Sequence, residues 1–174
     1  MMTLINMVRL IPQKNNNIYI IHKYKYIMKD EAFKENIAFG NIYEKKAVDY
    51  FDHDDFKMSE GKVSSHDIVF TKNNTEIKVE VKSDRLAYKT GNLCIEIESN
   101  SILSGLSVTQ ADFWLYFVIN PNGKNTIYKI PIDILWELTN RFINNYRFGG
   151  YKRLSKMVLI PTMLLHEYIV TSSS

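Results

Sequence analysis

The stretch that decides the fold is residues 67–82, which read DIVFTKNNTEIKVEVK. Apolar and polar residues alternate on both sides of Asn73 and Asn74, and this alternation is typical of half-buried strands. Two asparagines tolerate the left-handed backbone that a tight hairpin turn requires. The stretch therefore predicts a β-hairpin.

The second strand of this hairpin has one apolar face and one charged face, because side chains two positions apart point the same way. Glu80 and Lys82 stand side by side on the charged face. Asp67, at the start of the first strand, reaches the same end if the register pairs it near Glu80. The hairpin then brings two carboxylates and an amine to one point, although Glu80 and Lys82 alone would equally suit a surface pair.

Composition places the chain among folded globular proteins. Its 174 residues suit one domain with a core, and 45% of them are hydrophobic. No apolar run approaches the roughly 18 residues of a membrane span. A single cysteine, Cys94, excludes an internal disulfide and a cysteine zinc site, and it indicates a reducing, cytoplasmic compartment.

The net charge of +3 is unevenly placed along the chain. Residues 1–29 hold five basic residues and no acid, which leaves 17 basic and 19 acidic residues elsewhere. Binding to nucleic acid would therefore need a local patch and metal ions that bridge carboxylates to phosphate. We expect residues 1–27 to be an N-terminal extension and residues 28–174 to be a single domain.

Periodicity predicts an α/β fold. A helix carrying Glu44 is expected over 31–52, and the hairpin follows it. The resulting class is α/β, with a central mixed sheet of about four to five strands flanked by helices. Further elements expected along the chain are a strand at 92–98, a short helix after Thr109, a buried strand at 113–119, a strand at 126–130 and a helix at 132–146.

Two polar loops each have a functional and an ordinary interpretation. The loop at residues 52–55 resembles a metal cluster, but carboxylates packed into a loop are usually just solvated. The loop after the hairpin carries Arg85, Tyr88 and Lys89. These side chains are either merely exposed or placed to contact a DNA backbone.

The hairpin cluster suits a hard cation. Mg²⁺ prefers oxygen ligands and keeps several waters, so Asp67, Glu80 and the carbonyl of Val81 are its expected ligands. Mn²⁺ is expected to substitute for it. Lys82 would orient or deprotonate a water, or stabilise charge on the phosphate oxygens.

These residues resemble the PD-(D/E)XK nuclease superfamily, and the resemblance implies its restriction-endonuclease-like core, αβββαβ. Asp67 resembles the first acid of its motif, Glu80-Val81-Lys82 the E-x-K, and Glu44 the acid of the preceding helix. His66 stands where the motif's name has proline, a position that varies freely. Residues 91–98 and 104–114 resemble small nuclease-like proteins of phages and other large DNA viruses, including Holliday junction resolvase-like proteins, and the resemblance covers roughly residues 36–120.

The resemblance implies a Mg²⁺-dependent DNA endonuclease that selects branched or junction DNA and acts in the host cytoplasm if phage-encoded. Restriction-type or nicking enzymes, and an inactive DNA-binding module of the same fold, are the alternatives. Paired junction cuts would need two active sites and hence a homodimer.

Glu96 is a further candidate, as an outer acid of the metal site. Gln110 lies near a position where some members carry glutamine, and the alternative for this stretch is a helix N-cap turn at the neighbouring Thr109. The aromatic residues expected at an interface or in the core are Tyr146, Phe148 and Tyr151.

Overall fold

The computed structural model describes residue 31 and residues 34–59, 65–150 and 153–171. The chain divides into two units, Met1–Ala38 and Phe39–Ser174. The described residues of the first unit are all helical. The N-terminal extension expected at 1–27 lies entirely outside the described residues. The second unit carries every predicted site residue and is treated below.

The second unit begins with a helix. Residues 39–46 are helical and lead into a 3₁₀ helix at Ala47–Tyr50, in agreement with the helix predicted up to residue 52. Tyr43, Ala47 and Phe51 recur every four residues and are all buried. This spacing gives the helix one apolar face, and Glu44 lies beside that face and not on it.

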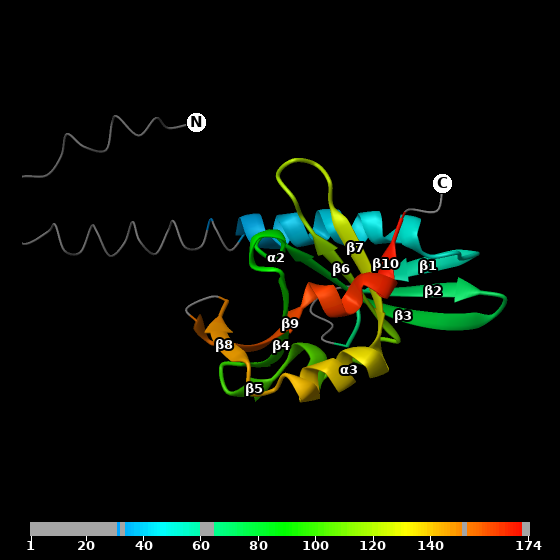
Figure 1. Cartoon of the computed structure of the whole chain (residues 1–174). Coiled ribbons are helices and arrows are strands. Elements are labelled where there is room, and N and C mark those ends of the chain that lie inside the picture. Colours follow the sequence, from blue (N-terminus) through cyan, green and yellow to red (C-terminus); the bar gives the residue numbers. More distant parts are fainter. Residues whose placement is uncertain (1–30, 32–33, 60–64, 151–152, 172–174) are drawn as a thin grey trace, which may run out of the picture. The chain divides into compact units, whose positions relative to one another are not determined.

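The main sheet is mixed, which confirms the predicted α/β class (Figure 1). Its strand order is β1-β2-β3-β6-β7-β10, six strands where four to five were expected. Only β3 and β6 pair in parallel, and the other neighbours are antiparallel. The strands are β1 (Asp55–Met58), β2 (Ile68–Lys72), β3 (Thr75–Asp84), β6 (Phe113–Val118), β7 (Thr126–Pro131) and β10 (Ile169–Val170).

The predicted hairpin is present as β2 and β3. Asn73 and Asn74 have φ of 48° and 62°, so both occupy the left-handed region expected of them at the turn. Ile68 pairs with Val79, and β3 then runs on to Asp84, beyond the start of β2. The hairpin strands therefore separate just where Asp67 lies.

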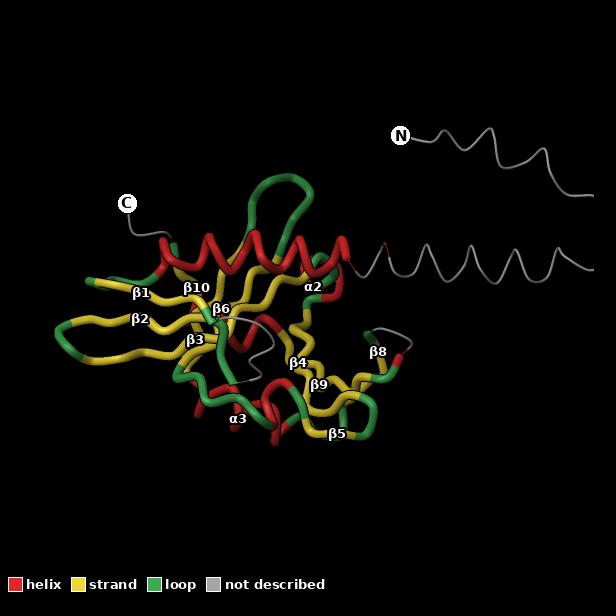
Figure 2. The backbone as a smooth tube through the Cα atoms, turned by 180° about the vertical axis from the view of Figure 1, so that it is seen from behind, coloured by secondary structure: helices red, strands yellow, loops and turns green. Residues whose placement is uncertain are grey.

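A second sheet is built from the chain between β3 and β6 and from the C-terminal part (Figure 2). Its order is β5-β4-β9-β8. Its strands are β4 (Asn92–Ser99), β5 (Ile102–Leu103), β8 (Tyr146–Gly149) and β9 (Ser155–Pro161). The strand predicted at 92–98 is thus real, but it belongs to this second sheet.

The described helical segments that follow the N-terminal helix are mostly short. They are α2 (Ala87–Thr90), η3 (Gly105–Ser107), α3 (Ile132–Arg141) and η5 (Thr162–Tyr168). The helix predicted after Thr109 is wrong, because Thr109 instead uses its hydroxyl to accept the Ala111 N–H and its backbone leads straight into β6. The helix predicted at 132–146 ends at Arg141, and Tyr146 starts β8. No described helix is long and apolar enough to cross a bilayer.

The two faces of the main sheet bury different apolar clusters. On the helix side, Phe51 stacks on Phe70 at a centroid distance of 4.7 Å, and Val79 and Val81 of β3 join them. On the other side, the second sheet and α3 cover Trp114 and Tyr116 of β6. Both clusters draw on β6, which explains why the strand predicted at 113–119 reads as a continuous apolar run.

Candidate active site at the divergence of two strands

Asp67 occupies the point where β2 and β3 separate. Its backbone N–H donates to the Val79 carbonyl at 2.9 Å. Its carboxylate Oδ2 accepts the Val81 N–H at 2.7 Å, in the place where a continuing β2 would have supplied a carbonyl. By the register of Ile68 with Val79, Asp67 stands next to Glu80. The structure thus brings together the two acids that the sequence predicted to meet.

Glu80 and Lys82 form an ion pair on the face of β3 opposite the helix-side cluster. Glu80 is only 8% exposed. Burial raises the pKa of Glu80, and the charges of Asp67 and Glu44 add to this rise while Lys82 opposes it. Burial alone would lower the pKa of Lys82, but the surrounding carboxylates outweigh it and raise that pKa instead. Lys82 is therefore a protonated cation among acids.

Glu44 reaches the same cluster from the helix. Its carboxyl is half-buried, and burial followed by repulsion from Asp67 raises its pKa, while Lys82 lowers it. Because these effects require proximity, Glu44 lies within electrostatic range of both residues. The helix places Glu44 one position after the buried Tyr43, at the rim of the apolar face. Charge thus couples Glu44 to Asp67 and Lys82, and its membership of the site stays a prediction.

Asp67, Glu80 and the Val81 carbonyl are the groups here that could hold a metal ion. Among the described residues, no group of three or more His, Cys, Asp or Glu side chains is arranged to hold a metal. Asp67 and Glu80 supply two carboxylates. The Val81 carbonyl faces the same side as the Val81 N–H that Asp67 accepts, because a strand residue presents both groups to one neighbour. Two carboxylates, one carbonyl and waters suit Mg²⁺ better than Zn²⁺.

Residues of β6 that the sequence did not single out complete the floor of the site. Trp114 pairs with Glu80 across the parallel ladder, and its fully buried ring lies 5.5 Å from the Lys82 Nζ. Tyr116 pairs with Lys82. The apolar run at 113–118 indicated a central strand but gave no signal of its partner, since pairing depends on the crossover between β3 and β6.

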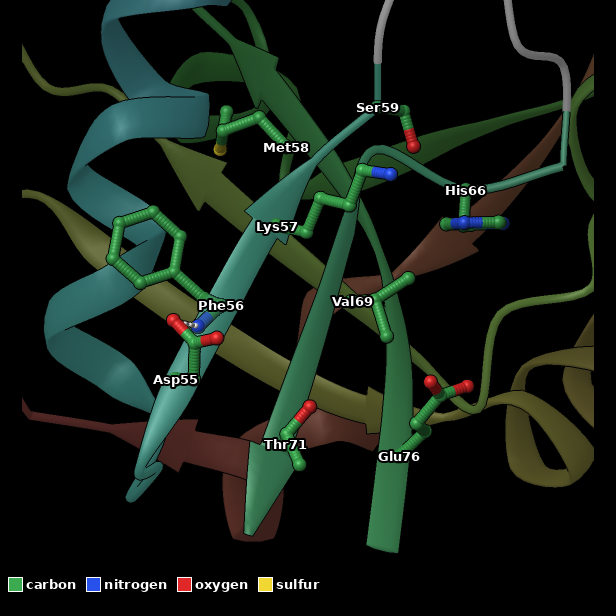
Figure 3. Close-up of a pocket in the computed structure, with 9 residues that line it drawn as sticks. All are labelled: Asp55, Phe56, Lys57, Met58, Ser59, His66, Val69, Thr71 and Glu76. Atoms are coloured by element: carbon green, nitrogen blue, oxygen red, sulfur yellow. Dashed lines mark hydrogen bonds between the residues drawn. The ribbon is translucent and has the colours of Figure 1, made fainter. Parts of the chain in front are cut away.

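A pocket of about 610 Å³ lies along the same face of the β1–β2–β3 sheet (Figure 3). Its lining includes Lys57, His66, Val69 and Glu76. Val69 follows Asp67 by two positions on β2, so both side chains point to the same face. The pocket thus continues from the acidic cluster toward the hairpin turn, although it contains none of the predicted catalytic residues.

The predicted DNA-contacting residues lie around α2. Arg85 and Lys89 are exposed, and Tyr88 is half-buried against the second-sheet cluster. Arg85 stacks over the Phe39 ring with 3.5 Å between the guanidinium carbon and the ring centroid. Asp84 accepts the N–H groups of Leu86 and Ala87, which fixes the turn out of β3. The segment is thus a capped helical turn directly after Lys82, and not an open loop.

The acidic loop at 52–55 has a structural role in the described residues. Lys72 bridges Asp52 and Asp54 at 2.8 and 3.3 Å, and Asp54 also accepts the Asn73 N–H. These contacts fasten the loop to the hairpin turn. The carboxylates of Asp52 and Asp54 therefore make ordinary structural contacts, and these explain the acidic loop without a metal.

Thr109 and Gln110 brace the segment that leads to Asp67. The Gln110 N–H donates to the Ser65 carbonyl at 2.8 Å, and the Thr109 hydroxyl donates to the same oxygen at 3.1 Å. The Gln110 side chain itself is exposed. Tyr146 and Phe148 are 40% and 49% exposed and lie on β8, whereas Tyr151 is outside the described residues.

Comparisons with known proteins give a likeness among solved structures. No family model matches the chain, and no curated protein matches it. Among solved structures, the bacterial homing endonuclease I-Ssp6803I is similar, with a TM-score of 0.42 and 20% sequence identity. The match covers 70% of this chain and 75% of that one. At this identity and TM-score, the likeness does not extend to activity.

Proposed function

We propose that this protein is a Mg²⁺-dependent DNA endonuclease that hydrolyses phosphodiester bonds. The observation that carries the proposal is the meeting of Asp67 with the Glu80–Lys82 pair at the divergence of β2 and β3. Two buried or half-buried acids beside a protonated lysine are costly to fold together unless a ligand relieves their repulsion. A cation that bridges the acids to a phosphate would do so.

Each residue has a distinct part in this proposal. Asp67, Glu80 and the Val81 carbonyl would hold Mg²⁺, with Mn²⁺ as a substitute. When bound, the ion polarises the scissile phosphate and lowers the pKa of a water. Lys82 would orient or deprotonate that water, or stabilise the developing charge on the phosphate oxygens. Glu44 adds a further negative charge within range of Asp67, which strengthens the attraction for a cation.

The phosphate backbone would approach over α2. Arg85 and Lys89 are exposed, with Arg85 stacked over the Phe39 ring, and these two cations would contact the backbone on either side of the cleaved phosphate. Contacts of this kind position a duplex without reading its sequence. Tyr88 is held half-buried and would contribute through its ring edge. A cytoplasmic site of action, where DNA and Mg²⁺ are both available, belongs to the same proposal.

The decisive experiment compares cleavage of three DNAs: supercoiled plasmid, a synthetic four-way junction and a linear duplex of the same arms. Each is incubated with the wild type and with Glu80→Ala, in Mg²⁺, in Mn²⁺ and in EDTA. We expect cleavage by the wild type in either metal, none in EDTA and none by Glu80→Ala. The enzyme proposal is abandoned if the wild type cuts no DNA in either metal.

The same cleavage experiment distinguishes a structure-selective enzyme from the alternative functions. Preference for the junction supports a structure-selective enzyme, and discrete plasmid fragments or nicks support the restriction-type or nicking alternative. Binding to DNA without cleavage, measured by gel shift, supports the inactive module. A homodimer is expected if both junction strands are cut together, and sedimentation with and without junction DNA measures it.

A further inference from the structure

The outer strand of the second sheet, β8, carries two exposed aromatic rings (Figure 1). Tyr146 and Phe148 are two positions apart on the strand, so their side chains point the same way. The two ring centroids lie 5.7 Å apart, with the ring planes nearly perpendicular at 88°. The Lys156 Nζ of β9 lies 4.5 Å from the centroid of the Tyr146 ring. Contiguous exposed rings of this kind mark an interaction surface.

Arginine side chains close the free edge of β8. Asn145, one residue before the strand, accepts an N–H from β9. Backbone groups alternate in direction along an antiparallel strand, so those of Tyr146 and Phe148 point away from β9. The Arg147 guanidinium donates to the Tyr146 carbonyl at 2.8 Å, and the Arg153 guanidinium donates to the Phe148 carbonyl at 3.4 Å. Carbonyls bonded in this way are not free to pair with a strand of another chain.

The same part of the chain is strongly basic. Residues 138–166 hold five basic residues and no acid. Two of them, Arg147 and Arg153, are exposed beside the rings of β8. Arg153 has a φ of 58°, a left-handed conformation that is unfavourable for a residue with a Cβ, and from it the side chain reaches back to β8. Rings that can stack on bases, beside cations that attract phosphates, are the chemistry that binds single-stranded nucleic acid.

The strand β9 links this surface to the predicted DNA contacts at α2. The Thr162 N–H, directly after β9, donates to the carbonyl of Gly91, the residue that ends α2, at 2.9 Å. The other end of β9 pairs with β8. The seven residues of β9 span about 20 Å. A single strand that leaves a duplex at α2 therefore reaches β8 within about six nucleotides.

We propose that the β8 surface, formed by Tyr146, Arg147, Phe148, Arg153 and Lys156, binds unpaired nucleotides of DNA. This inference rests on the function proposed above, because it takes DNA to be the substrate. It narrows the substrate to DNA in which a single-stranded segment adjoins a duplex. A second copy of the chain that adds a strand to β8 is the other occupant of such an edge, and the two arginine-bonded carbonyls disfavour it.

Binding in EDTA tests the inference without cleavage. Fluorescence anisotropy measures the affinity of the full chain for a labelled oligothymidylate of about 15 nucleotides and for a duplex of the same length. The variants are Phe148→Leu, Phe148→Trp and the matched control Phe56→Leu, which changes an exposed phenylalanine on β1, the outer strand of the main sheet. We expect Phe148→Leu to weaken oligothymidylate binding about tenfold, the loss of one stacked base. Phe148→Trp should stay within about twofold of the wild type because an indole ring also stacks, and Phe56→Leu should bind as the wild type does.

Several results would overturn the inference. They are the absence of oligothymidylate binding by the wild type, equal affinities of Phe148→Leu and Phe56→Leu, and an equal loss of duplex binding in Phe148→Leu. Sedimentation tests the other occupant, since a wild-type dimer that Phe148→Leu converts to a monomer would assign β8 to a second copy. These failures leave the cleavage assay of the proposed function untouched. A wild type that cuts no DNA but binds oligothymidylate through Phe148 would instead refute the endonuclease and retain the β8 surface.

Discussion

The same three-residue pattern, Glu-x-Lys, occurs twice on one face of β3, and only one copy lies in the candidate site. Glu76 and Lys78 lie toward the hairpin turn, where β2 continues beside them and Glu76 is exposed. Glu80 and Lys82 lie where β2 has ended, and Glu80 is 8% exposed. The pattern itself therefore carries little information. What makes a site is the gap in the sheet, into which Asp67 turns its carboxylate.

A second contrast on β3 has the same form. Asp67 and Asp112 each stand one residue before a neighbouring strand, and each accepts a β3 backbone N–H, from Val81 and Lys78 respectively, at 2.7 Å. Asp112 is exposed, whereas Asp67 is half-buried beside Glu80. The two aspartates lie on opposite sides of β3, and each closes the ladder of its own strand near Val79. Asp67 closes its ladder next to the charged Glu80–Lys82 pair.

The largest expected difference is between Glu80→Gln and Glu76→Gln. Glu80→Gln removes a carboxylate that we assign to the cation, so cleavage in Mg²⁺ should fall by roughly 100-fold or more. Glu76→Gln changes an exposed side chain on the same face and should leave the rate within about twofold. Initial rates on the preferred DNA measure both variants. Similar losses in the two variants would remove the distinction between the ends of β3.

The lysines provide the next comparison. Lys82→Ala should lower kcat by about 100-fold, because it removes the ammonium group proposed to act on the phosphate during cleavage. Lys78→Ala should affect only DNA affinity, with a slightly weaker dependence on salt. Single-turnover rates and gel shifts at two salt concentrations separate these effects. A loss of binding without a loss of single-turnover rate in Lys82→Ala would reassign Lys82 to DNA contact.

The aspartates are compared by stability. Asp112→Ala removes an acceptor for the Lys78 N–H and should lower the free energy of unfolding by about 1 kcal/mol without changing the cleavage rate. Asp67→Asn keeps an acceptor for the Val81 N–H but loses the charge, so it should fold normally and cut poorly. Urea unfolding and cleavage rates, taken on the same preparations, test the pair. A large stability loss in Asp67→Asn would show that its charge is structural.

Glu44→Gln is expected to have the smallest effect on stability. The pKa of Glu44 is raised by folding, so the folded state binds its proton more tightly, and stability falls as pH rises above the ordinary glutamate pKa of about 4.3. Removing the charge should therefore stabilise the protein at pH 7 by about 0.3 kcal/mol, a small gain because water screens the half-exposed group. No gain is expected near pH 4. The exposed Glu137 on α3, changed to Gln, is the control.

Several elements could be predicted because their signal is local. Alternation and the asparagine pair determined the hairpin, and the left-handed φ of Asn73 and Asn74 agrees with it. The meeting of Asp67 with Glu80 followed from the register, since a short turn leaves little freedom in pairing. The continuous apolar run of β6 predicted a strand covered on both faces, and it is buried from Trp114 to Val118.

The second sheet could not be predicted, because alternation shows which residues share a face but not which strand lies beside them. β4 pairs with β9, more than fifty residues later in the chain, and only the folded structure brings them together. The helix predicted after Thr109 was wrong for a different reason. A capping sequence predicts a helix, but the same hydroxyl can hold a turn against a distant carbonyl, here that of Ser65.

The parallel pairing of β3 with β6 also bears on the order of folding. A parallel pair must wait for its crossover, here residues 85–112, and such distant contacts form more slowly than hairpins. Glu44, Asp67, Glu80 and Lys82 are all synthesised before β6. On the ribosome, therefore, a nascent chain holds its complete set of predicted catalytic side chains while β3 still lacks its central neighbour. The proposed cleavage activity should therefore appear only after residues 113–118 have emerged and docked.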